Sequence, residues 1–186
     1  WSYSISMKFF LIIIFSFFVT NISYGATEKL YLKCKPIVTK NKSTGPLKNI
    51  VKEGQVVQII LSELILSKKS AKITSYMPAL FNTSIEDEYN KKIKFPTIEK
   101  QKAKIKDNSY MGEEVFSGKP DGKQTDMIDR LTLINKDNNW SAKYRVLTRT
   151  GDIDVNFTSE GKCVLVDKKY YKNIIKNGPT KEDYNF

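Results

Sequence analysis

The stretch from Asp126 to Val166 constrains the fold more than any other part of the sequence. Polar and apolar residues alternate along its runs, as expected for strands with one buried face and one wet face. Turn-forming residues separate the runs at 136–139, 150–152 and 159–161. Connections this short permit only antiparallel pairing, because a parallel crossover needs a dozen or more residues. The stretch therefore predicts an antiparallel meander of three or four strands.

The alternation also assigns each side chain of the meander to a face. In the first run Leu131 and Leu133 share one face, while Arg130 lies on the other with Ile128 and Ile134. In the next two runs one face carries Trp140, Ala142, Tyr144, Val146, Ile153, Val155 and Phe157. In a barrel this apolar face would point inward.

Three side chains of these strands are candidates for ligand binding. Arg130 shares its face with apolar residues, so it either forms an ion pair with Asp126 or Asp154 or lines a cavity for an anionic ligand. Trp140 and Tyr144 share a face on which aromatic side chains either fill the core or form the floor of a ligand cavity. The sequence leaves both pairs of alternatives open.

The N-terminal region predicts export. One lysine, a short apolar run and small residues at the cleavage spacing indicate a cleaved secretory signal peptide over residues 7–25. The alternative, a membrane anchor, needs about 20 apolar residues, so we expect no transmembrane segment after signal cleavage. Residues 1–6, ahead of Met7, are interpreted as over-translation or a fragment edge. The predicted location is the periplasm or the exterior.

The two cysteines predict a single disulfide. In an exported chain Cys34 and Cys163 are most simply bonded to each other, which would join the start of the mature chain to the end of the meander. The alternative is a pair of buried free thiols. Signal removal leaves enough residues for one domain with its own core. We therefore expect a β-domain over 26–167, followed by a short C-terminal helix and tail over 168–186.

Charge and histidine content restrict the possible functions. The formal net charge is +11, and Arg130, Arg145 and Arg149 are the only arginines. Nucleic-acid recognition usually relies on Arg, so the Lys-rich composition argues against a nucleic-acid partner and favours attraction to anionic surfaces. The sequence contains no histidine, which excludes Ser-His-Asp and Cys-His nucleophile systems and the commonest zinc sites.

Acidic residues do not select a catalytic pair or a metal site. The clusters that could serve acid–base chemistry, as in glycoside cleavage, are 86–88, Glu113–Glu114 and Asp126 with Asp129. The run 152–156 resembles the start of a calcium loop, but Phe157 stands where that loop needs glycine. We therefore predict a solvated strand face there, with no catalytic residue, no enzyme activity, no metal and no cofactor.

Shorter patterns predict the remaining elements. Strands are expected at 28–38, 55–67 (where a helix is the alternative) and 71–76. Residues 91–106 have the pattern of exposed strands, and Pro96 confines that region to an edge or an irregular stretch. Short helical segments are expected near 84–90, behind a capping-box pattern, and at 168–177, between Asp167 and Gly178. The last residues, 181–186, are expected to form a frayed tail.

Three short motifs carry a resemblance to known proteins. They are Leu30–Cys34, Ile128–Leu133 and Gly161–Cys163. With these motifs the chain resembles small exported bacterial β-proteins that have one disulfide and no assigned activity. The resemblance implies a β-barrel or sandwich of lipocalin-like size. A lipocalin by descent would carry Gly-x-Trp near its first strand, and that motif is missing from the sequence.

The expected fold is all-β, an antiparallel meander that closes into a small barrel or a two-layer sandwich. Two functions are compatible with it. The first is a non-catalytic module that binds an envelope protein or an anionic surface through its loops and Lys-rich face. The second is a lipocalin-like carrier of a small apolar or anionic ligand, with Trp140 and Tyr144 lining its cavity.

Overall fold

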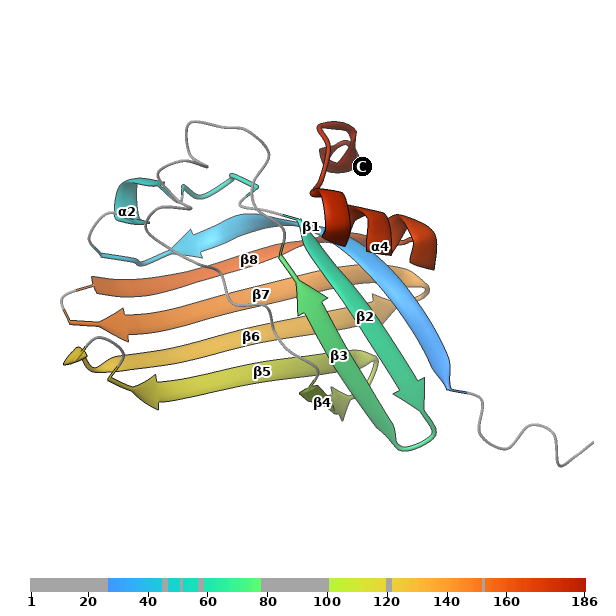
Figure 1. The fold of residues 1–186 in the computed structure, drawn as a ribbon, viewed down its shortest axis with the longest axis horizontal. Helices are drawn as coiled ribbons and strands as arrows, with labels where there is room; N and C mark the ends of the chain where they lie inside the picture. The colour runs from blue at the N-terminus through green and yellow to red at the C-terminus, as the bar shows by residue number, and fades with distance from the viewer. Residues whose placement is uncertain are drawn as a thin grey trace, which may run out of the picture.

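Eight antiparallel strands follow one another around a closed barrel (Figure 1). The computed structural model describes residues 27–44, 47–50, 52–56, 59–77, 101–119, 122–151 and 153–186. The predicted signal peptide, the helical segment near 84–90 and Pro96 lie outside these residues. The strands are β1 (Glu28–Asn41), β2 (Ile60–Ser67), β3 (Ser70–Tyr76), β4 (Gln101–Lys106), β5 (Ser109–Gly118), β6 (Thr125–Lys136), β7 (Asn139–Thr150) and β8 (Ile153–Leu165).

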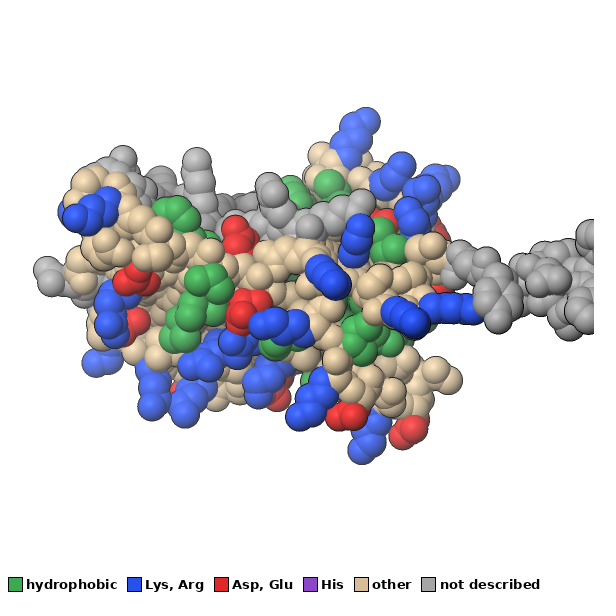
Figure 2. Space-filling model, turned by 90° about the horizontal axis from the view of Figure 1, so that it is seen from below, with side chains coloured by type: hydrophobic (Ala, Val, Ile, Leu, Met, Phe, Trp, Pro, Cys, Tyr) green, Lys and Arg blue, Asp and Glu red, His purple; other side chains and the backbone are tan. Residues whose placement is uncertain are grey.

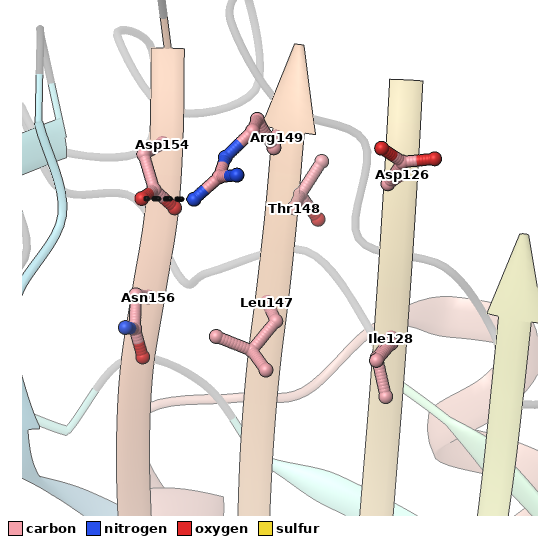
Figure 3. Close-up of a pocket in the computed structure, with 7 residues that line it drawn as sticks. All are labelled: Asp126, Ile128, Leu147, Thr148, Arg149, Asp154 and Asn156. Atoms are coloured by element: carbon pink, nitrogen blue, oxygen red, sulfur yellow. Dashed lines mark ion pairs between the residues drawn. The ribbon is translucent and has the colours of Figure 1, made fainter. Parts of the chain in front are cut away.

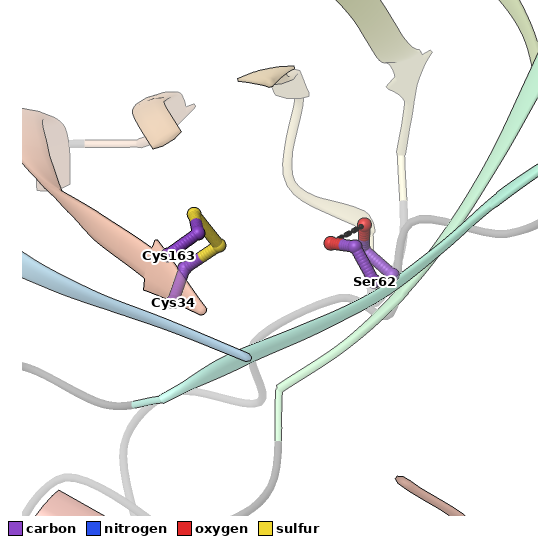
Figure 4. Close-up of a disulfide and its surroundings, with 4 residues drawn as sticks. Cys34, Ser62 and Cys163 are labelled. Atoms are coloured by element: carbon purple, nitrogen blue, oxygen red, sulfur yellow. Dashed lines mark hydrogen bonds between the residues drawn. A yellow bond between two sulfur atoms is a disulfide. The ribbon is translucent and has the colours of Figure 1, made fainter. Parts of the chain in front are cut away.

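The first and last strands close the barrel. β8 pairs with β1 through a ladder that runs from Leu32↔Leu165 to Asn41↔Phe157, which settles the choice between barrel and sandwich. Cys34 and Cys163 are direct partners in this ladder and form the predicted disulfide (Figure 4). The alternative of free thiols is therefore wrong.

The predicted meander is confirmed as β6, β7 and β8, with one correction. Residues 159–161 were expected to form a turn, but β8 continues through them from Ile153 to Leu165. Gly161 serves a different purpose, because a Cβ atom at this position would lie 2.0 Å from the carbonyl oxygen of Lys35 on β1. Glycine here permits close approach of the two strands at the closing seam.

Side chains fill the barrel from both walls. The core includes Leu32, Cys34, Val38, Ile60, Leu64, Ile73, Leu131, Leu133, Trp140, Tyr144, Val146, Phe157 and Cys163. The Trp140 ring stacks on Tyr110 at a centroid distance of 6.0 Å, and Tyr144 meets Phe157 edge-on at 6.2 Å. Ser62 and Ser75, buried on β2 and β3, satisfy each other through a 2.9 Å hydrogen bond (Figure 4).

The two walls differ in length. β5 to β8 are long strands that lie side by side, whereas β2, β3 and β4 cross the other wall as shorter strands (Figure 1). The β4–β5 ladder runs only from Lys106↔Ser109 to Lys104↔Met111. Beyond it, the remaining length of β5 to Gly118 pairs with β6.

An amphipathic helix covers the outer face of β1 and β2 (Figure 1). The predicted segment 168–177 is confirmed as α4 (Lys168–Asn177), where the Asp167 carboxylate accepts from the Tyr170 N–H and Gly178 ends the helix with φ 80°. Tyr171 and Ile174 of α4 form a second apolar cluster with Leu61 of β2 and with Ile59, the residue just before that strand. Within the described part of the chain, no helix has the length and apolar character needed to cross a membrane.

The C-terminal residues are ordered against β1, so the expectation of a frayed tail is wrong. A 3₁₀ turn, η2 (Glu182–Tyr184), places Asp183 in a buried position. The Lys33 ammonium lies 3.6 Å from the Asp183 carboxylate and donates a 2.7 Å hydrogen bond to the Tyr170 hydroxyl, which in turn donates to Asp183. Burial lowers the pKa of Lys33, while Asp183 partly opposes that shift.

Candidate functional site

The register separates the three predicted ligand-binding side chains. Trp140 and Tyr144 point into the barrel, where they belong to the core cluster. Arg130 lies on the outer face, since it neighbours the inward residues Asp129 and Leu131 along β6 and is partnered by Arg145 on β7. One ligand therefore cannot contact all three side chains.

Arg130 forms an ion pair, but with an unpredicted partner. Its Nε donates a 2.7 Å hydrogen bond to the Glu113 carboxylate of β5, and its Nη2 also donates to that carboxylate. The hydrogen bond from Arg130 is the main cause of a lowered pKa at Glu113. The partners expected from sequence are engaged elsewhere: Asp126 accepts from Ser117, and Asp154 pairs with Arg149.

Among the described residues, the outer face of the long wall carries a smaller and a larger groove. The smaller, about 210 Å³, is lined by Asp126, Ile128, Leu147, Thr148, Arg149, Asp154 and Asn156. Figure 3 shows the Arg149 guanidinium directed toward Asp154 on the neighbouring strand, at 3.7 Å. Arg149 therefore offsets Asp154, while the second carboxylate of the groove, Asp126, accepts hydrogen bonds from Ser117 and Gln124. Asp154 and Asn156 lie on the solvated strand face. In the described chain no group of three or more metal-ligating side chains comes together.

The larger groove, about 510 Å³, crosses the seam where the barrel closes. It is lined by Thr39, Lys40, Lys42, Lys143, Arg145, Asn156, Thr158 and Glu160, which come from β1, β7, β8 and the residues after β1. We call it the seam groove. Lys and Arg side chains are spread over the face seen in Figure 2, with acidic side chains among them.

A β-bulge directs the lysines of the seam groove outward. The β1–β8 register shifts between Val38 and Lys40, so Thr39 is an extra residue on β1. Before the bulge the even-numbered residues Cys34 and Val38 point inward; after it, Lys40 and Lys42 are exposed. If regular alternation continued through Thr39 in place of the bulge, both lysines would point toward the interior.

Hydrogen bonds to β8 hold the lysine-bearing segment in place. The Lys42 N–H donates to the Asn156 carbonyl at 2.8 Å, and the Asn156 N–H donates to the Ser43 hydroxyl at 3.0 Å. The Thr39 hydroxyl donates to the Thr158 carbonyl at 3.2 Å. The backbone under the lysines is therefore fixed to the wall that carries Arg145.

The seam groove carries uncompensated positive charge. Lys143 is paired with Glu160 at 2.6 Å. Lys40, Lys42 and Arg145 form no ion pair within the described residues, and Arg145 stands directly opposite another cation, Arg130. Like charges opposite each other across strands are destabilising, so folding alone does not explain this arrangement. A bound anionic group would compensate it.

Two acidic residues instead point into the barrel. Glu114 of β5 and Asp129 of β6 are direct cross-strand partners, and Asp129 is completely buried. Desolvation by burial raises the pKa of Asp129 to about 7; the Tyr144 hydrogen bond opposes the rise, and Glu114 adds to it. Sequence reasoning noted these residues only as members of separate clusters, because the strand that contains Glu114 was not predicted.

Comparison with protein-family models, with curated proteins and with solved structures found no match. The geometry of the site is therefore the basis for a functional proposal.

Proposed function

We propose that this protein is an exported, non-catalytic binding domain whose seam groove holds an acidic segment of a partner protein. The observation that carries the proposal is the gathering of Lys40, Lys42 and Arg145 around one groove without an acidic partner among the described residues. The sheet already fixes the backbone beneath these cations, so binding needs to order only their side chains, and carboxylates of a partner would supply charge-assisted hydrogen bonds to them.

The other lining groups favour a polypeptide over a lipid surface. The groove also contains the hydroxyls of Thr39 and Thr158, the amide of Asn156 and the carboxylate of Glu160. A polypeptide offers N–H donors to Glu160 and carbonyl acceptors to the hydroxyls and the amide. A plane of lipid phosphates offers no donor to the remaining acceptor sites of Glu160, whose charge Lys143 offsets.

Export to the periplasm or the exterior is part of this proposal. The disulfide between Cys34 and Cys163 supports it, because disulfides form and persist in oxidising compartments. The signal-peptide pattern of residues 7–25 supports the same location.

A pair of matched arginine variants tests the proposal. The probe is a fluorescent peptide of alternating Glu and Ser, and its affinity is measured by anisotropy. Arg145→Ala should weaken binding about tenfold, as expected when one charge-assisted hydrogen bond is lost. Arg149→Ala is the control, because Arg149 lies on the same strand and face but pairs with Asp154. Its affinity should stay within about twofold of the wild type.

Two outcomes would contradict the proposal. Equal losses in both variants would mean that binding reflects diffuse charge rather than the seam groove. Tighter binding to vesicles containing anionic lipid than to the peptide, with the same dependence on Arg145, would assign the groove to a lipid surface.

A further inference from the structure

The inner wall of the barrel contains a carboxyl pair that no cation of the described residues neutralises. Glu114 and Asp129 are cross-strand partners on β5 and β6, so their Cβ atoms lie about 5 Å apart. Lys and Arg side chains of the described strands occupy the outer positions of the alternation. On β6 and β7 the nearest of these are Arg130 and Arg145, which flank inward-pointing residues.

The pair is also short of hydrogen-bond donors. The Tyr144 hydroxyl of β7 donates to Asp129 Oδ1 at 3.3 Å. Asp129 Oδ2 and Glu114 Oε2 are buried, and neither has a hydrogen-bond partner within the described part of the chain. Two ionised carboxylates in this setting would be desolvated and would repel each other.

We propose that Glu114 and Asp129 form a proton-binding site, in which Asp129 holds a proton beside the Glu114 carboxylate and releases it as the pH rises. A single proton converts one carboxylate into a hydroxyl donor, which can satisfy an oxygen of the other. It also removes the repulsion across the β5–β6 ladder. This inference does not depend on the proposed function of the seam groove.

The consequence is a barrel that loses stability as the pH rises. Burial raises the pKa of Asp129 from 3.8 to about 7, so between these values the folded chain binds a proton that the unfolded chain has lost. Stability therefore falls with rising pH across this window and levels off above it. Loss of the proton would weaken the segment of β5 around Glu114. This segment lies beyond the β4–β5 ladder and pairs with β6.

Equilibrium unfolding in urea, with the disulfide intact, tests the inference. For the wild type, the unfolding equilibrium constant should rise by up to about tenfold per pH unit between about pH 5 and pH 7. Asp129→Asn keeps the size of the side chain and removes its charge, so its profile should be nearly flat. Asp126→Asn is the control, because Asp126 lies on the same strand with its side chain exposed, and its pKa is lowered. This variant should retain the wild-type slope.

A second variant keeps the inference testable if Asp129→Asn fails to fold. Glu114→Gln removes the neighbouring charge that contributes to the raised pKa of Asp129, so the levelling-off should move to lower pH. A flat wild-type profile between about pH 5 and pH 7 would overturn the inference. So would a Glu114→Gln profile identical to that of the wild type.

Discussion

Arg130 and Arg145 are direct cross-strand partners on the outer face of the barrel, and of the two only Arg130 donates to a carboxylate of the described residues. Glu113 neutralises Arg130, which leaves the charge of Arg145 facing the seam groove. An arginine that contributes to folding stability would be expected to pair with an acidic residue. Replacing Arg145 is therefore predicted to increase the stability of the fold while weakening the binding of an acidic ligand.

Removing Arg145 should not destabilise the fold. Arg145→Ala relieves the repulsion with Arg130, and we expect it to raise the free energy of unfolding by ~0.2–1 kcal/mol, as measured by urea denaturation. The same change should weaken binding of the acidic peptide. A loss of stability greater than about 1 kcal/mol would instead indicate that Arg145 has a structural role.

The lysines beyond the bulge should give the binding its salt dependence. Replacing Lys40 and Lys42 together with Gln should lower affinity for the acidic peptide and flatten its dependence on sodium chloride, because fewer charges remain to be screened. The control replaces Lys72 and Lys102, an exposed cross-strand pair outside the seam groove. Titrations at about 50 mM and about 300 mM salt compare the two double variants. Similar behaviour of both would argue against a localised site.

The disulfide should contribute several kcal/mol to stability. It closes a loop with a sequence separation of 129 residues, for which the chain-entropy model gives ~4–5 kcal/mol. Urea unfolding of the Cys34→Ala, Cys163→Ala double variant should show a loss approaching that value. Reductant should bring the wild type to a similar midpoint and leave the double variant unchanged. If reductant shifted both proteins equally, the effect could not come from this bond.

Glycine at position 161 should be required for the closing seam. A methyl group there would meet the Lys35 backbone, which cannot move without breaking the β1–β8 ladder, so Gly161→Ala should cost ~3 kcal/mol or more. At Gly118 the added methyl group meets only the tip of the Phe116 ring, which can rotate away. Thermal unfolding of Gly118→Ala should therefore show a clearly smaller loss, and equal losses would contradict the assignment.

The buried Lys33–Asp183 pair should stabilise the C-terminal turn. Asp183→Ala leaves the Lys33 ammonium buried without its carboxylate, and we expect a loss of ~2–4 kcal/mol in the free energy of unfolding. Glu182→Ala removes the adjacent carboxylate of the same turn, which is exposed, and should change stability by less than about 0.5 kcal/mol. Comparable losses in the two variants would argue that the turn contributes through its backbone instead.

The sequence predicts most of the long wall because local rules apply there. Alternation and turn residues identify β6 and β7 and the start of β8, and the cap at Asp167 with the stop at Gly178 identifies α4. The extent of β8 is not predictable in this way. Gly161 suggests a turn in isolation, and its real purpose depends on a strand more than a hundred residues away.

Both sites depend on pairings that local patterns do not contain. β5 was not predicted because its inward positions include Gly112 and Glu114, which break the apolar alternation. Because the sequence pattern does not predict β5, it also does not predict that Glu114 is the cross-strand partner of Asp129. The outward direction of Lys40 and Lys42 was also not predictable from local patterns, because the bulge at Thr39 is defined only by the register between β1 and β8.

The seam groove takes Lys40 and Lys42 from the end of β1 and the residues just after it, and takes Thr158 and Glu160 from β8, so it joins the first and last strands of the barrel. A chain that has been synthesised only to a point before β8 contains Lys40 and Lys42 but lacks the strand that fixes their backbone in the folded barrel. Binding of the proposed partner would therefore require that β8 has been synthesised and has paired with β1.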